Sequence, residues 1–307
     1  RAGIGTMGVH LMSDTVIADF DRKLAREAFE QRAAQGAAAL TRLGAGADVP
    51  VALIMRNDLT QLEVMRAAAM AGTVIVAQNW HAAAEEAGAI CDDSGAQFVI
   101  IHRDLIDALR PALEGRTVIA VTPDTALRQA YGIDDAAAKT DPETPEWSAL
   151  VDAADPITPR EMMRPLMRYT SGSTGKPKGV RRLGGGPKRD FEEVLSRVGT
   201  EMLQLKPGSR FFTAAPIYHS APSTLTSAAL VTPGVSTFVA PKFDPESFLA
   251  TIEAQLPQSE AQQYATTVRA LTQGRGTLTM EFDHYGEVPA HLVTKIVGEL
   301  TQESAKA

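Results

Sequence analysis

Val51-Ala-Leu-Ile-Met55 is a short, continuously apolar run, and similar runs recur at Thr73-Val-Ile-Val76, Gln97-Phe-Val-Ile-Ile101 and Thr117-Val-Ile-Ala-Val121. Runs of this length are typical of parallel strands that are buried on both faces. Stretches of helical length separate them, and the first begins after the N-cap candidate Asp58 and ends at Gly72. The alternation predicts an α/β protein with a doubly wound, mostly parallel sheet.

The pattern continues on both sides of this segment. A helix is expected over residues 20–43, ended by Gly44. Residues 123–163 are rich in proline and aspartate and interrupt the alternation, and the stretch Asp141–Glu146 is expected to form a loop. Strands and helices are then expected to alternate again, over residues 166–169 (strand), 190–205 (helix), 210–213 and 236–239 (strands) and 248–256 (helix).

Composition limits the class of protein. The chain has 307 residues, of which 44% are hydrophobic and 22% charged, values typical of a folded globular protein. Its net charge of −7 argues against general nucleic-acid binding. The single cysteine, Cys91, excludes an internal disulfide and favours the cytoplasm, and no apolar run is long enough to span a bilayer.

The most informative loop is Tyr169-Thr-Ser-Gly-Ser-Thr-Gly-Lys-Pro-Lys-Gly-Val180, which follows an expected strand. Glycines let backbone N–H groups approach an anion, hydroxyls donate to phosphate oxygens, and lysines neutralise them. The loop therefore predicts a polyphosphate site. It is not a Walker A loop, because Gly172 and Gly175 are too close together and Pro177, not Ser or Thr, follows Lys176.

This loop resembles the phosphate-binding loop of the adenylate-forming superfamily, which includes acyl-CoA synthetases and firefly luciferase. The resemblance implies that side chains of the loop surround the β- and γ-phosphates of ATP while its glycines shape the backbone. The residues so implied are Thr170, Ser171, Gly172, Ser173, Thr174, Gly175, Lys176, Lys178 and Gly179. Further stretches between residues ~20 and 256 resemble acyl-CoA ligases.

A second segment, Ala215-Pro-Ile-Tyr-His-Ser-Ala-Pro222, resembles the family's Pro-x-x-His motif. A lone histidine between a strand and a helix is more often structural. Behind the phosphate loop and in the right order, however, His219 is expected to position the substrate. The resemblance implies ATP, Mg²⁺ and coenzyme A as co-substrates or cofactors and a small carboxylic acid as substrate. No metal-ligating residue is assigned.

Three motifs of the family are absent downstream of His219: Tyr-Gly-x-Thr-Glu, the Gly-Asp that binds the ribose, and the domain with the adenylation lysine. Missing transition-state contacts of this kind cost orders of magnitude in rate. We therefore expect a truncated ligase domain over residues 1–256 with impaired activity.

The tail, residues 257–304, reads as helix, strand and helix, with Leu278, Met280 and Phe282 alternating along the strand. It resembles the C-terminal end of translation elongation factor G through Arg269–Gly276 and Met280–Tyr285. The resemblance implies half of a ferredoxin-like domain, joined at Leu256/Pro257 as a fusion over residues 257–307. The alternative function is thus a non-catalytic nucleotide-binding or ribosome-associating fusion protein, and the oligomeric state stays open.

Overall fold

The structure is a computed structural model, and the residues it describes are 4–5, 15–137, 143–160, 162–163, 166–170, 178–180, 186–245, 248 and 285–286. The chain divides into two compact units. Ser13–Lys242 form one, and Arg1–Met12 with Phe243–Ala307 form the other. In the latter unit, β1 (Ile4–Gly5) pairs antiparallel with β14 (Tyr285–Gly286). The boundary expected at Leu256/Pro257 and nearly all of the tail lie outside the described residues.

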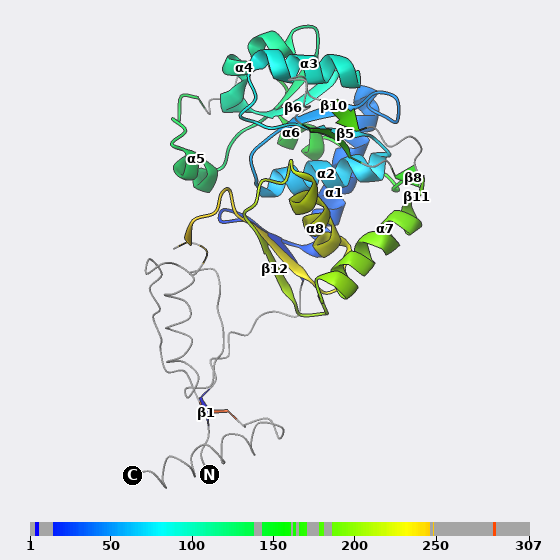
Figure 1. Cartoon of the computed structure of the whole chain (residues 1–307), viewed down its shortest axis with the longest axis vertical. Coiled ribbons are helices and arrows are strands. Elements are labelled where there is room, and N and C mark those ends of the chain that lie inside the picture. The colour runs from blue at the N-terminus through cyan, green and yellow to red at the C-terminus, as the bar shows by residue number, and fades with distance from the viewer. Residues whose placement is uncertain are drawn as a thin grey trace. The chain divides into compact units, whose positions relative to one another are not determined.

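A six-stranded sheet forms the centre of the larger unit (Figure 1). Its order is β10 (Lys178–Val180), β9 (Met167–Thr170), β5 (Ile75–Ala77), β4 (Val51–Ile54), β6 (Phe98–His102) and β7 (Thr117–Val121). Neighbouring strands are parallel except β10, which is antiparallel to β9. The four apolar runs thus form the expected parallel strands.

Helices cover both faces of this sheet, as a doubly wound fold requires. Alternate strand residues such as Leu53 and Ile100 pack with α1 (Arg26–Leu43), α2 (Leu59–Ala71) and α6 (Trp147–Asp152). The intervening residues, such as Ile54 and Ile101, pack with α3 (Ala84–Ser94) and α4 (Ile106–Leu113). Both layers are visible in Figure 1. Continuous apolar strands are needed because each face has its own core.

A second sheet in this unit has four strands. Its order is β12 (Arg210–Thr213), β13 (Ser236–Val239), β2 (Val16–Ala18) and β3 (Lys23–Ala25). The first three strands are parallel and β3 is antiparallel to β2. Helix α8 (Ser220–Val231) connects β12 with β13. The sequence pattern does not show that the strands are distributed over two sheets.

The expected helix boundaries are confirmed in part. Asp58 caps α2, with Oδ1 accepting from the Gln61 amide at 2.6 Å, and Gly72 ends it with φ 66°. The expectation that a helix starts at residue 20 is wrong, because residues 23–25 pair with β2 as a strand. The helix expected over residues 190–205 is α7 (Lys188–Arg197), followed by a π-helical turn over Val198–Met202.

Residues 123–163, which interrupt the alternation, contain two short helices in the part that the structure describes. They include α5 (Thr125–Tyr131), which Asp124 caps, and α6, whose Trp147 is 1% exposed. A pair of two-residue strands, β8 (Met162–Met163) and β11 (Gly186–Pro187), follows. Among the described residues, no helix is long and apolar enough to cross a membrane.

Candidate functional site

Strands β9 and β10 frame the predicted phosphate loop. Thr170 is the last residue of β9 and pairs with Lys178, the first residue of β10. Because β9 is parallel to β5 and β5 to β4, residue 170 lies at the same carboxyl edge of the sheet as the ends of those strands. Six of the predicted loop residues lie outside the described residues: Ser171, Gly172, Ser173, Thr174, Gly175 and Lys176.

Gly179 stands where no side chain fits. A Cβ at this position would lie 2.7 Å from Cε of Met167 and 2.7 Å from Cζ of Tyr169. The Tyr169 hydroxyl donates to Oδ2 of Asp93 at 2.6 Å, and burial with this carboxylate raises the pKa of Tyr169. The glycine therefore lets the hairpin close over a fixed tyrosine.

His219 is exposed at the N-cap position of α8. Its ring lies 4.3 Å from that of Tyr218, and its carbonyl accepts from the Ser223 amide at 3.1 Å. The segment that carries it, residues 214–219, follows the carboxyl end of β12. An exposed imidazole at the end of a parallel strand is free to contact a ligand.

Asn57, just beyond the carboxyl end of β4, fixes the segment that leads to His219. Its Oδ1 accepts from the Ile217 amide at 2.9 Å, and its Nδ2 donates to the carbonyls of Ala215 at 2.9 Å and Ala240 at 3.4 Å. The residue is 3% exposed. One buried carboxamide thus joins the carboxyl edges of the two sheets.

Arg168 makes a second connection between the two predicted motifs. It lies in β9, two residues before Thr170, and its Nη2 donates to Oγ of Ser223 at 3.0 Å and to Oγ1 of Thr224 at 3.4 Å. Both hydroxyls belong to the first turns of α8, the helix that follows His219. The strand that leads into the loop is therefore bonded to the helix of the second motif.

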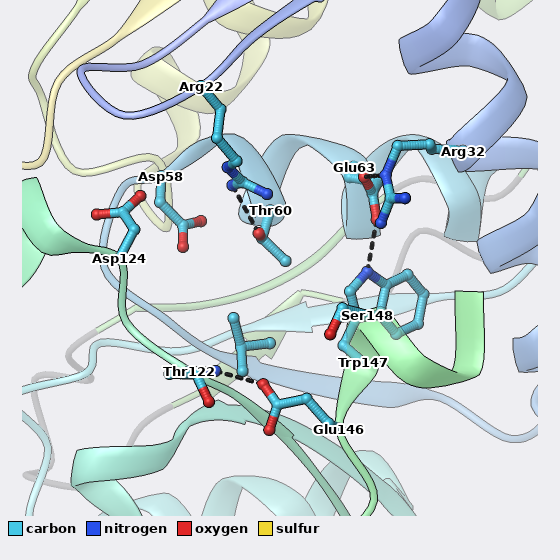
Figure 2. Close-up of a pocket in the computed structure, with 11 residues that line it drawn as sticks. Arg22, Arg32, Asp58, Thr60, Glu63, Thr122, Asp124, Glu146, Trp147 and Ser148 are labelled. Carbon is cyan, nitrogen blue, oxygen red and sulfur yellow. Dashed lines mark hydrogen bonds and ion pairs between the residues drawn. The ribbon is translucent and has the colours of Figure 1, made fainter. Parts of the chain in front are cut away.

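A cavity of about 210 Å³ lies beside the first turn of α2 (Figure 2). Figure 2 shows Asp58 and Asp124 at one end and Glu63, Trp147 and Arg32 at the other. The remaining lining residues are Arg22, Thr60, Val121, Thr122, Glu146 and Ser148.

The carboxylates of this cavity are bonded to other parts of the protein. Glu63 accepts from Nε of Arg32 at 2.7 Å and from Nε1 of Trp147 at 2.8 Å, and Oδ2 of Asp58 lies 3.0 Å from Nε2 of His102. Burial, and then the charge of Asp58, raise the pKa of Asp124 to about 7. The carboxylates of Glu63 and Asp58 therefore hold α2 against α1, α6 and β6.

A metal site is not evident in the part of the chain that the structure describes. No group of three His, Cys, Asp or Glu side chains there could hold an ion. The hydroxyls that could contact a metal–phosphate complex belong to residues 171–174, outside that part.

The geometry defines an α/β protein in which Thr170, where the predicted loop begins, and His219 lie at the joined carboxyl edges of two mostly parallel sheets, where such folds bind their ligands. The family model described as "AMP-binding enzyme" matches residues 10–272. Since this is most of the 307 residues, the chain belongs to the AMP-binding enzyme family.

Curated proteins and solved structures agree with this family. The chain is 29% identical over 251 residues to YdaB of Bacillus subtilis (strain 168), a protein named provisionally as an acyl-CoA ligase, and the match covers 78% of this chain and 45% of YdaB. A benzoate CoA ligase from Burkholderia xenovorans LB400 has a similar structure, with a TM-score of 0.60 at 19% identity over 79% of this chain and 45% of the ligase.

MatB from Rhodopseudomonas palustris gives a TM-score of 0.60 at 22% identity, covering 77% of this chain and 44% of MatB. At these identities the two structures show the fold. The chain spans less than half the length of YdaB and of both structures.

A separate short match confirms the second resemblance. A stretch of 51 residues is 53% identical to elongation factor G of Aquifex pyrophilus, and it covers 17% of this chain and 7% of that protein. The site residues that the sequence did not predict are Asn57 and Arg168. Asn57 looks like an ordinary turn residue beside the helix cap, and Arg168 is one polar residue in a short strand, so neither gave a signal.

Proposed function

We propose that this chain binds ATP at the loop of residues 171–177 and takes part in AMP-forming activation of a small carboxylic acid for transfer to coenzyme A. The observation that supports this most is the Asn57 clamp. It holds the His219 segment against the carboxyl edge of the sheet at which the loop begins. The two motifs that the sequence assigns to one reaction would then face one ligand.

In this proposal the hydroxyls and lysines of the loop hold the β- and γ-phosphates, and Mg²⁺ accompanies the ATP. A carboxylate oxygen of the acid attacks the α-phosphorus, and the bond to the β-phosphate oxygen breaks with release of pyrophosphate. The coenzyme A thiol then attacks the acyl carbon, loses its proton, and expels AMP. His219 positions the acid, and the protein contributes mainly orientation and charge stabilisation.

Ligands in structural neighbours support the substrate classes. ATP is bound in a structure of MatB, and anthranoyl-AMP is bound in a structure of the anthranilate CoA ligase AuaEII. A nucleotide and a carboxylic acid are therefore the ligands to test first. The elongation factor G match covers too little of that factor to support ribosome association. A cytoplasmic location, inferred from the single cysteine Cys91, remains part of the proposal.

We further propose that catalysis by these 307 residues is impaired. Its support is the sequence after His219, which lacks the Thr-Glu pair and the Gly-Asp pair of the family's later motifs. Nucleotide binding without acyl-AMP formation is accordingly the second candidate function.

Pyrophosphate release from Mg·ATP, measured with a panel of aliphatic and aromatic carboxylic acids, tests both candidates. Acid-dependent release above that of the Lys176→Ala, Lys178→Ala double variant would establish adenylation and overturn the proposed impairment. ATP binding without release would establish the second candidate. A folded chain that neither binds ATP nor releases pyrophosphate would overturn both.

A further inference from the structure

Arg168 connects the strand that leads into the predicted phosphate loop with the helix that follows His219. Its main chain lies in β9, paired with Ala77 on one side and with Val180 on the other, so the residue is held by both neighbouring strands. Its guanidinium reaches out of the sheet to Ser223 and Thr224 in α8. Ser223 is 2% exposed, and its amide donates to the carbonyl of His219.

These contacts form a short continuous path from the start of the predicted phosphate loop to His219. Two residues separate Arg168 from residue 171, where the predicted phosphate loop begins, and one hydrogen bond separates Ser223 from the main chain of His219. A guanidinium that donates to two hydroxyls is a directional contact, which lysine reproduces only in part. Any displacement of Arg168 would reach the first turns of α8 through these hydrogen bonds.

We propose that Arg168 is a positioning residue that couples occupancy of the phosphate loop to the placement of His219. The inference rests on the proposed function, since it requires a phosphate ligand at residues 171–177. Arg168 acts through Ser223 and α8 and does not itself contact the acid. Its role is to adjust the placement of the imidazole for the acid when the polyphosphate is bound.

Inorganic tripolyphosphate with Mg²⁺ is the probe that isolates this path, because it offers the phosphates of ATP without an adenosine that could touch His219 directly. The readout is the imidazole resonance of His219 in protein labelled at its six histidines, assigned with His219→Gln. We expect tripolyphosphate to shift the His219 resonance in the unmodified chain.

In Arg168→Met at saturating tripolyphosphate, we expect most of this shift to be lost, with affinity weakened by no more than about tenfold, the size of one charge-assisted hydrogen bond. Arg168→Lys should restore part of the shift. The matched control is Arg197→Met, which removes an exposed arginine paired with Glu201 on α7 and should leave the shift unchanged.

Ser223→Ala, Thr224→Val tests the same contact from the helix side, and thermal unfolding of each variant checks that it is folded. We expect this double variant to lose the shift as Arg168→Met does, with no further loss when the three changes are combined. An unchanged His219 shift in folded Arg168→Met overturns the coupling.

The proposed function can fail separately from the coupling. ATP binding with no His219 response to tripolyphosphate in the unmodified chain overturns the coupling alone. The absence of ATP binding overturns both.

Discussion

The Asn57 carboxamide uses both of its hydrogens and its oxygen on the main chain of a segment 158 to 183 residues away. Removing a buried amide of this kind lowers the stability of the fold, because each partner left without a hydrogen bond stays buried and unsatisfied. Its hydrogen bonds join groups that are adjacent in the fold but far apart in the sequence. The position of His219 therefore depends on a residue that has no assigned role in the proposed reaction.

Asn57→Ala should lower the free energy of unfolding by about 2–3 kcal/mol, because the Ala215 and Ala240 carbonyls and the Ile217 amide lose their partner. Urea denaturation measures the change. Asn79→Ala is the matched control, since Asn79 is exposed and its side chain accepts from the His81 amide, and it should cost below ~0.5 kcal/mol. Equal losses in the two variants would contradict the clamp.

Asp124 gives a pH-dependent prediction. Its pKa rises from 3.8 to about 7 on folding, so the folded chain binds this proton more tightly than the unfolded chain. The associated stability is fully present below pH 3.8 and is lost as the pH rises through about 7.

Asp124→Asn keeps the oxygen that caps α5 but cannot ionise. Compared with the unmodified chain, the variant should therefore gain about 1–2 kcal/mol in relative stability between pH 4 and pH 8, a range discounted for the partial exposure of the carboxyl. Urea denaturation at both pH values provides the comparison. A stability difference that stays constant with pH would show that Asp124 is not buried against Asp58 as described.

At the scale of elements, the packing of α1, α2 and α6 depends on one close approach. A Cβ at Gly36 in α1 would lie 2.7 Å from Cζ2 of Trp147 and 3.0 Å from Cβ of Ala67. Trp147 is held in place by its hydrogen bond to Glu63, so it cannot easily move away. The small residue in the middle of α1 is what allows the short helix α6 to dock.

Gly36→Ala should destabilise the chain by about 1–3 kcal/mol through overpacking, although alanine is the better helix former. Gly88→Ala in α3 is the matched control, because its Cβ would meet Ala112 at ordinary distances of 3.5 and 3.6 Å. That variant should instead gain about 0.5–1 kcal/mol from helix propensity. Thermal unfolding of the two variants should thus shift in opposite directions, and a shift in the same direction would contradict the packing.

The same elements show what sequence can and cannot predict. Strands β4, β6 and β7 were predictable because burial on both faces demands continuous apolar runs. The segment 20–25 was misassigned because a distant strand supports it: Lys23–Ala25 pair with β2, β2 pairs in turn with β13, and the Phe20 ring lies 5.0 Å from that of Phe238. Helix α6 was missed since its main anchor, the bond from Trp147 to Glu63, spans 84 residues.

The candidate site residues also divide into those suggested by a local sequence pattern and those identified only by the fold. The loop and His219 are proposed from local sequence patterns, whereas Asn57 and Arg168 are singled out only by their tertiary contacts.

At the scale of the whole molecule, the larger unit brings two sheets together at their carboxyl edges. The six-stranded sheet contributes the strand that enters the predicted phosphate loop, and the four-stranded sheet contributes the segment with His219. Neither sheet alone presents both motifs. ATP binding should accordingly require the unit Ser13–Lys242 in its folded state.

Titration of Mg·ATP into the folded 307-residue chain by calorimetry tests this account most directly. The account predicts binding at one site, weakened about tenfold or more in Lys176→Ala, Lys178→Ala, where phosphate-neutralising charges are lost. Lys206→Ala, which removes an exposed lysine before β12, should bind as the unmodified chain does. Absence of binding by the folded chain, or binding that the double variant leaves unchanged, would contradict the account.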